Sequence, residues 1–241
     1  MTGAPPAAIE LSGVSKSFGP VAANRDVSLT VVAGSIHGIV GENGAGKSTL
    51  MSILYGFYEA DSGEIRVRGA KRTIRSSAEA IAAGIGMVHQ HFMLVEPLSV
   101  VENVVLGAEG GPWLKRGLAK ARAELARLSA QYGLAIDPDA TVGSLSVGLQ
   151  QRVEILKALY RGAEVLILDE PTAVLTPAEA DQLFELLRAL KAQGKTVILI
   201  THKLREIMAV TDPVSVMRRG EMVAHVETAQ TSPAELAEAM V

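Results

Sequence analysis

The segment GENGAGKST, residues 41–49, has the residue types and spacing that bind the phosphates of a nucleotide. It fits the pattern G-x-x-x-x-G-K-[ST], and it follows an apolar run typical of a strand and precedes a stretch typical of a helix, as the pattern requires. Glycines let several backbone N–H groups turn toward one anion, and a plain glycine-rich turn would not need Lys47 at this spacing. We expect Lys47 to neutralise the β- and γ-phosphates and the Ser48 hydroxyl to bind Mg²⁺. The expected nucleotide-binding residues of this loop are Gly41, Asn43, Gly44, Ala45, Gly46, Lys47, Ser48 and Thr49.

Two carboxylates, Asp169 and Glu170, stand at the end of the apolar run VLILDE. Such a run is expected for a strand buried on both faces of a parallel sheet, and ligands of these sheets bind at the carboxyl edge of the strands. Carboxylates at a strand end can also be ordinary solvated residues, but a phosphate loop in the same chain favours a role in chemistry. We therefore expect Asp169 to hold Mg²⁺, and Glu170 to orient an attacking water or accept its proton.

His202 and Gln90 each follow another predicted strand, so the same sheet edge is expected for both. His202 comes directly after TVILIT, where it can contact a γ-phosphate and the attacking water, although a histidine in this place is more often a turn or core residue. Gln90 ends IGMVHQ, and its amide can orient water or contact the metal. His89 and His91 flank Gln90, but a separate metal site there is disfavoured because no third ligand is evident.

Phe18 and the segment LSVGLQQR, residues 145–152, are further candidates for binding a nucleotide. Phe18 lies in the N-terminal β-type region, where it can stack on an adenine for about 1–3 kcal/mol, or can simply belong to the core. Ser146 and Gly148 stand at the start of a predicted helix. A serine there is an ordinary N-cap, but free N–H groups and the positive end of the helix dipole also suit an anion.

The pattern of elements that must position these residues predicts an α/β fold in three parts. The strand–helix–strand order of VLILDE, PAEADQLFELLRALKAQG and TVILITH argues for a parallel sheet core. A β-rich piece precedes this core, and a helical segment at about residues 94–162 is inserted into it. The chain ends in a predicted hairpin that turns at Arg219–Gly220, followed by a short helix. We expect a flexible tail at residues 1–8 and one domain over residues 9–241.

Composition narrows the class of protein further. The chain has 241 residues, of which 48% are hydrophobic, so it can bury a substantial core. Its net charge of −3 gives no overall basic footprint for nucleic acid, and the lack of cysteine excludes disulfides and cysteine-based metal sites. The N-terminus lacks the features of a signal peptide, and the apolar runs are too short to span a bilayer. We expect a soluble protein that can dock onto a membrane protein.

These motifs, in this order, resemble the ATP-binding subunit of ABC transporters over about residues 9–226. GENGAGKST matches the family's Walker A motif, VLILDE matches Walker B with its catalytic glutamate, and LSVGLQQR matches the family signature. Gln90 matches the Q-loop, His202 the switch histidine, and Phe18 the adenine-stacking aromatic. The resemblance implies a P-loop NTPase fold with a RecA-like parallel-sheet core, an N-terminal antiparallel β subdomain and an inserted helical subdomain. It also implies MgATP hydrolysis, with Ser48, Gln90 and Asp169 setting the Mg²⁺ and its waters.

The resemblance further implies partners and a location. Two nucleotide-binding domains would meet head to tail, so that Ser146 and Gly148 face the γ-phosphate on the other domain. The surface around Gln90 and the following helical segment would meet the cytoplasmic loops of a permease, and a substrate-binding lipoprotein would act through that permease. The protein would then lie peripherally at the cytoplasmic face of the inner membrane. Alone, the chain is expected to bind ATP but to hydrolyse it weakly.

A narrower resemblance points to importers of nucleosides and simple sugars. GMVHQHFMLVEPLSVVENVVLG looks like this group, and HQHFMLV points more toward its nucleoside branch. In this group the ATPase is usually one chain with two tandem halves, and this sequence is similar to the first half only; a truncated chain and a half-size subunit both remain open. Thr176 replaces the Asp of the wider family that helps the two sites communicate, whereas Lys47, Glu170 and His202 are kept.

Two alternative functions fit the sequence less well. A soluble ATPase of the same superfamily, acting in DNA repair or translation, would usually carry a long coiled-coil insertion or basic linkers, and the acidic balance also disfavours it. A nucleotide-dependent regulator that binds ATP without useful turnover is disfavoured by Glu170 and His202.

Overall fold

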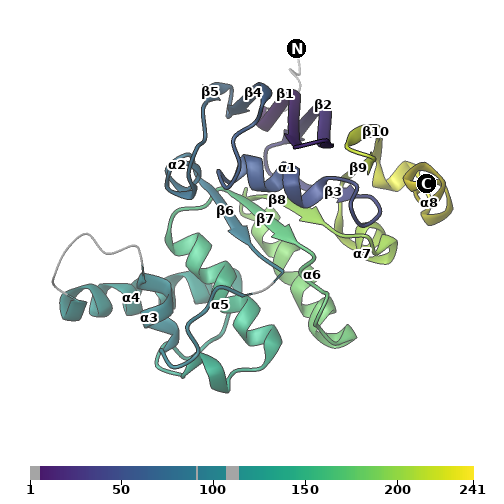
Figure 1. Cartoon of the computed structure of the whole chain (residues 1–241). Coiled ribbons are helices and arrows are strands. Elements are labelled where there is room, and N and C mark those ends of the chain that lie inside the picture. The colour runs from purple at the N-terminus through teal and green to yellow at the C-terminus, as the bar shows by residue number, and fades with distance from the viewer. Residues whose placement is uncertain (1–5, 91, 107–113) are drawn as a thin grey trace, which may run out of the picture.

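The N-terminal part of the chain forms a four-stranded antiparallel sheet in the order β2-β1-β4-β5 (Figure 1). The protein is described by a computed structural model for residues 6–90, 92–106 and 114–241. The strands of this sheet are β1 (Ala7–Phe18), β2 (Val21–Val32), β4 (Ser62–Val67) and β5 (Ala70–Arg72). The predicted antiparallel β subdomain is therefore present.

The start of β1 differs from the predicted tail at residues 1–8. Ala7 already pairs with Val32, Ala8 is buried, and the Pro6 carbonyl accepts a hydrogen bond of 2.9 Å from the Ala33 N–H. Residues 1–5 lie outside the described part of the chain. The predicted tail is therefore too long at its C-terminal end, because pairing with β2 orders Ala7 and Ala8.

The second sheet has six strands in the order β10-β9-β3-β8-β7-β6. Its strands are β3 (Ile36–Val40), β6 (Ile85–Val88), β7 (Val165–Asp169), β8 (Thr196–Ile200), β9 (Pro213–Arg218) and β10 (Glu221–Glu227). Only β10 runs antiparallel to its neighbour, β9. The predicted hairpin turns at Arg219 and Gly220, which both have positive φ (50° and 87°), as a tight two-residue turn between twisted strands requires.

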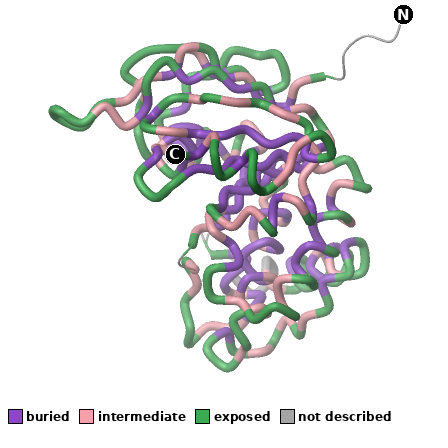
Figure 2. The backbone as a smooth tube through the Cα atoms, turned by 90° about the vertical axis from the view of Figure 1, so that its right-hand side faces the viewer, coloured by how far each residue is buried: buried purple, intermediate pink, exposed green. Residues whose placement is uncertain are grey.

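Successive residues of β7 show why the apolar runs lack alternation. Leu166 and Leu168 belong to one hydrophobic core, whereas Val165 and Ile167 belong to another on the opposite face of the sheet. The second core lies between the two sheets and includes α1 (Lys47–Leu54). The strands β3, β6, β7, β8 and β9 are therefore buried on both faces, whereas the edge strand β10 has no buried residue. Exposed stretches of chain lie toward the outside of the molecule (Figure 2).

The other helices surround the two cores, and all of them except the first, whose Ala80 belongs to the second core, contribute to the core that contains Leu166 and Leu168. They are α2 (Ser77–Ala82), α3 (Val100–Val105), α4 (Leu114–Tyr132), α5 (Val147–Tyr160), α6 (Pro177–Ala192), α7 (Leu204–Val210) and α8 (Pro233–Met240), with short 3-10 turns at Val142–Ser144 and Thr228–Gln230. α3, α4 and α5 pack on one another at the lower left of Figure 1, within the region predicted to be helical. None of the described helices is long and apolar enough to cross a membrane.

Candidate nucleotide-binding and catalytic site

The phosphate loop (residues 41–49) leaves β3 and enters α1, and it is held closely by two neighbouring strands. Gly46 has a φ of 100°, and a Cβ there would lie 2.3 Å from the carbonyl oxygen of Ala23 in β2. A Cβ on Gly41 would lie 2.2 Å from the carbonyl oxygen of Met217 in β9. There is no space for a side chain at either position. The loop therefore needs glycine here for steric reasons as well as for conformational freedom.

Lys47 is buried, and its Nζ donates to the carbonyl oxygens of Gly41 (2.6 Å) and Glu42 (2.9 Å). Burial lowers the pKa of this ammonium, while the nearby Glu170 and Asp169 act in the opposite direction. The Lys47 ammonium thus lies against the backbone of the loop and is influenced by the charges of the acidic pair Asp169 and Glu170. A positive charge at this point suits a polyphosphate.

Asp169 is the last residue of β7, and the Ser48 hydroxyl donates to its Oδ1 across 3.3 Å. Burial raises the pKa of Asp169; the hydrogen bond from Ser48 and the charge of Lys47 act in the opposite direction, and Glu170 adds to the rise. A hydroxyl and a carboxylate oxygen side by side are the donors that Mg²⁺ prefers, and a nearby dication would stabilise the ionised carboxylate. These residues therefore fit a divalent cation.

Glu170 has an unusual backbone conformation and a largely buried side chain. Its φ is 49°, in the left-handed region, where a non-glycine residue is strained. Its Oε1 lies 2.9 Å from Nδ1 of His202, and its Oε2 is buried with no hydrogen-bond partner among the described residues. Because a carboxylate only accepts hydrogen bonds, the histidine Nδ1 carries the proton. One carboxylate oxygen is therefore oriented by His202, and the other can accept a hydrogen bond.

Strand register explains why Glu170, His202 and Gln90 come to the same edge. In β6 and β7, Val88 pairs with Leu168, so Gln90 and Glu170 each lie two residues beyond this pair. In β7 and β8, Asp169 pairs with Ile200, so Glu170 lies one residue and His202 two residues beyond that pair. The predicted convergence of these three positions at the carboxyl edge is present. Gln90 is exposed.

Of the two histidines beside Gln90, the structure describes His89, which packs against an aromatic ring. His89 stacks on Phe57 with ring centroids 5.4 Å apart, and His91 lies outside the described part of the chain. No cluster of three or more His, Asp or Glu side chains suited to a metal was found among residues 6–90, 92–106 and 114–241. Burial lowers the pKa of His89, so its ring is a partner for aromatic packing.

Phe18 lies at the end of β1 with 42% of its surface exposed, so it is not a core residue. Its ring makes an edge contact with Tyr58 at 5.0 Å between centroids, and Lys16 Nζ lies 5.6 Å from its centre. The turn after Phe18 leads into β2, which approaches the phosphate loop at Ala23. Tyr58 was missed by sequence reasoning; its only signal is an aromatic pair, Phe57–Tyr58, shortly after α1.

Ser146 and Gly148 begin α5, away from the hydrogen bonds of the phosphate loop. The Ser146 hydroxyl accepts from the N–H of Leu149 (3.4 Å), and the Gly148 N–H donates to Oε1 of Glu179 (3.3 Å). Glu179 in turn forms a capping box with Thr176 at the start of α6. Thr176 is therefore the N-cap of α6, which gives a structural reason for threonine at this position.

Two buried amides also reach the site, and sequence reasoning missed both. Asn24 donates through Nδ2 to the Gly46 carbonyl at 3.1 Å, and its Oδ1 has no partner within the described residues. Gln151 donates through Nε2 to the Pro171 carbonyl at 2.7 Å. Both contacts join segments about twenty residues apart, and neither side chain has a local sequence signal.

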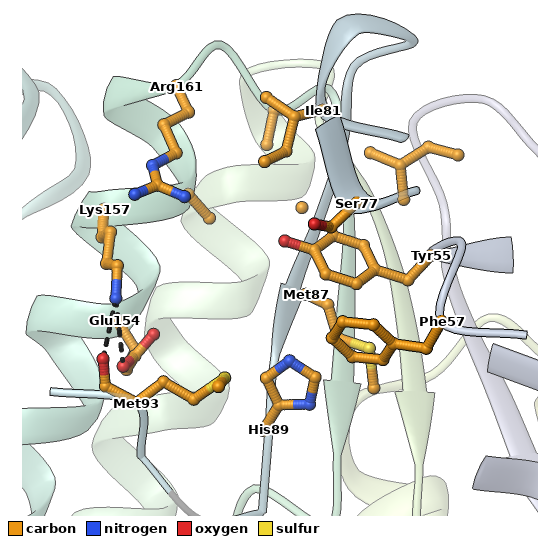
Figure 3. A pocket seen from close by; sticks show the side chains of 14 residues that line it. Tyr55, Phe57, Ser77, Ile81, Met87, His89, Met93, Glu154, Lys157 and Arg161 are labelled. Carbon is orange, nitrogen blue, oxygen red and sulfur yellow. Dashed lines mark hydrogen bonds and ion pairs between the residues drawn. The ribbon is translucent and has the colours of Figure 1, made fainter. Parts of the chain in front are cut away.

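A separate pocket of about 290 Å³ lies beside β6 and α5 and does not include the acidic pair (Figure 3). Lys157 donates to the Met93 carbonyl at 2.9 Å and lies 3.7 Å from Glu154. Burial raises the pKa of Glu154 and lowers that of Lys157. Arg161 and Tyr55 lie around the same space, so this side pocket combines charge with aromatic surface.

Comparison with known proteins gives a consistent result. A family model described as ABC transporter matches residues 24–173. The nucleoside import ATP-binding protein NupA of Lactococcus lactis subsp. cremoris is 51% identical over 97% of this chain and 46% of its own length. The glucose import ATP-binding protein TsgD13 of Haloferax volcanii is 49% identical over 97% of this chain and 48% of its own. The chain thus spans about half the length of the curated relatives it matches.

Solved structures agree with the fold described above. The ATP-binding cassette MJ1267 is 27% identical and superposes with a TM-score of 0.85 over 98% of this chain and 99% of its own. The cassette MJ0796, described as dimeric, is 25% identical with a TM-score of 0.77 over 91% of this chain and 98% of its own. The predicted fold class, with its parallel-sheet core and antiparallel sheet, is confirmed.

Proposed function

Because the chain is an ATP-binding domain of the ABC transporter family, we propose that it hydrolyses ATP to drive import through a membrane permease. One observation carries the proposal. Glu170 lies directly beyond Asp169 with one carboxylate oxygen on His202 and the other buried without a partner among the described residues. A carboxylate held in this way is placed to orient an attacking water and to accept its proton.

The residues of the chain have distinct parts in this reaction. Lys47 and the N–H groups of the phosphate loop neutralise and hold the phosphates, and Phe18 stacks on the adenine. His202 keeps the Glu170 carboxylate oriented through its Nδ1–H and supports the γ-phosphate. Catalysis of this kind is mostly positioning and stabilisation of charge.

Mg²⁺ fits the oxygen donors of Ser48 and Asp169, with Gln90 completing the set through the metal or its waters. When bound, the ion supplies positive charge that polarises the phosphate oxygens. Asp169 would contribute a carboxylate oxygen to the ion, and Ser48 orients its hydroxyl toward that carboxylate.

We also propose the partners that the site requires. A second nucleotide-binding domain would contribute Ser146 and Gly148 to the γ-phosphate held here, and this chain would do the same for its partner; the dimeric description of MJ0796 supports such a pair. The partner is a second copy or the other half of a tandem chain. Residues 9–241 would act as one ATPase domain, with a helical subdomain at about residues 94–162.

We assign the surface around the side pocket to contact with the permease. It opens beside His89 and Met93, on either side of the Gln90 segment, and Met93 is 62% exposed. The names of the relatives support nucleosides or simple sugars as cargo. The protein would be held peripherally at the cytoplasmic face of the inner membrane. A substrate-binding lipoprotein would deliver the cargo to the permease.

Replacing Glu170 with Gln tests the assignment of the base. The change keeps the size of the side chain and its contact with His202, but an amide cannot accept a proton from water. ATP turnover in the assembled complex should fall by about a hundredfold or more, while ATP binding is retained. Glu185→Gln, at an exposed carboxylate on α6, is the matched control. Near-wild-type turnover in the Glu170→Gln protein would exclude Glu170 as the base.

A further inference from the structure

Gln151 joins the helix that starts with the signature residues to the strand end that carries Glu170. Its side chain is only 2% exposed, and its Nε2 donates to the carbonyl oxygen of Pro171 at 2.7 Å. Pro171 follows Glu170 directly in the chain. A buried carbonyl needs a partner, so loss of the Gln151 amide would leave this one unpaired next to the strained Glu170 backbone.

The opposite side of the same short segment is held by α7. The Thr172 hydroxyl donates to Glu206, and Lys203 Nζ donates to the Thr172 carbonyl at 3.0 Å. Lys203 is the residue after His202, so this contact returns to the histidine that orients Glu170. The Pro171–Thr172 segment is therefore fixed between α5 on one side and the His202 region on the other.

Gln151 lies three residues after Gly148 in α5, and therefore on the same face of the helix. The Gly148 N–H donates to Glu179, one helical turn before Gln151, and Arg152 donates to Gln182 at 2.6 Å. These two contacts join the first turns of α5 to α6, and the Gln151 amide joins the same part of α5 to the segment between Glu170 and α6. A rotation or shift of the start of α5 would therefore move the Gln151 amide relative to the Pro171 carbonyl.

We propose that Gln151 is a positioning residue that couples the signature end of α5 to Glu170 of the same chain. The inference rests on the proposed function, in which Ser146 and Gly148 serve one ATP site and Glu170 serves the other. Engagement of the signature residues by the partner's phosphate would then set the Pro171 carbonyl, and with it Glu170, for hydrolysis in the second site. This route does not use Thr176, whose side chain caps α6.

The first test compares Gln151→Met with Gln150→Met in the 241-residue chain. Methionine keeps the length of the side chain but removes the donor. Gln150 is a matched control because its amide donates to the carbonyls of Val142 and Leu145, which precede the helix. In Gln151→Met, kcat should fall about tenfold while KM for ATP changes little, and Tm should fall by only a few degrees because one buried carbonyl loses its partner. The kcat of Gln150→Met should stay about fivefold or more above that of Gln151→Met.

A pH profile adds a readout that a purely structural role would not move. Gln151→Glu keeps the shape, but its carboxyl can donate to the Pro171 carbonyl only when it is protonated. Burial raises the pKa of such a carboxyl, so kcat should recover toward the wild-type value as pH falls from about 8 to about 6. A Gln151→Glu profile parallel to that of the wild type would contradict the proposal.

Mixed pairs of chains separate this role from a defect in the signature residues themselves. When Gln151→Met chains are mixed with an excess of Glu170→Gln chains, the competent site takes Glu170 from the Gln151→Met chain and its signature residues from the other. We expect the low kcat of Gln151→Met. A chain with both substitutions, mixed with the wild type, should instead match the mixture of Glu170→Gln and wild type.

The outcomes distinguish the inference from the function on which it rests. No ATP hydrolysis by the wild-type chain, either alone at any concentration or in the assembled complex, would overturn the proposed function and this coupling with it. If the wild type hydrolyses ATP and the kcat of Gln151→Met is unimpaired, the coupling alone is overturned. The same holds if Gln151→Met mixed with Glu170→Gln keeps a normal kcat while the chain with both substitutions lowers the kcat of its mixture with the wild type.

Discussion

His37 should make the folded chain sensitive to acid. It lies in β3 with no exposed surface, its Nε2 is 2.9 Å from the Ser215 hydroxyl, and its Nδ1 has no partner among the described residues. Burial, and secondarily the charge of His225, lower the pKa of His37 from 6.5 to about 3. The ring is therefore neutral in the folded state at pH values where a histidine of the unfolded chain is protonated.

The sign follows from the number of protons bound. Between pH 3 and pH 6.5 the unfolded state binds more protons at this position, so the free energy of unfolding decreases as pH falls below 6.5. At pH 5 the difference of 1.5 pH units corresponds to a loss of roughly 2 kcal/mol relative to neutral pH. This is a large part of the stability of an ordinary domain.

Urea unfolding of the wild type and of His37→Gln at pH 7.5 and pH 5 measures this loss. Glutamine can still bond the Ser215 hydroxyl but does not titrate, so the variant should lose about 2 kcal/mol less than the wild type between the two pH values. His225→Gln is the control, because it leaves His37 buried and should retain most of the loss. Equal pH dependence in the wild type and His37→Gln would refute the reasoning.

Three further predictions concern the nucleotide site. ATP turnover per chain should rise with chain concentration and stay low where sedimentation shows a monomer, because half of each site comes from the partner; vigorous hydrolysis by a monomer would contradict this. Gly46→Ala should abolish measurable ATP binding, since its Cβ would meet the Ala23 carbonyl oxygen at 2.3 Å, whereas Gly44→Ala, also at positive φ but with open space, should cost only about 1 kcal/mol of stability. Phe18→Ala should weaken ATP binding by about 1–3 kcal/mol in calorimetric titration, and the control Phe57→Ala, which packs on His89, should not.

Features that depend on neighbours in sequence were predictable. The phosphate loop, the acidic end of β7 and the hairpin at Arg219–Gly220 each need a few residues at fixed spacing, and their local conformations follow from glycine, hydrogen bonding and apolar runs. The parallel core was also predictable, because strands buried on both faces alternate with amphipathic helices. The convergence of Glu170, His202 and Gln90 followed once all three strands were taken to run in the same direction.

The tertiary structure alone decided which distant segments meet. A buried amide such as Asn24 or Gln151 has no pattern of its own in the sequence, and its partner carbonyl belongs to a segment brought near by packing. The same holds for the exposure of Phe18 beside Tyr58 and for the burial of His37, since neither a lone aromatic nor a lone histidine specifies its surroundings. Apolar periodicity indicates that a face is buried but not against what, so strand order and side-chain contacts across the core are settled only when the whole chain folds.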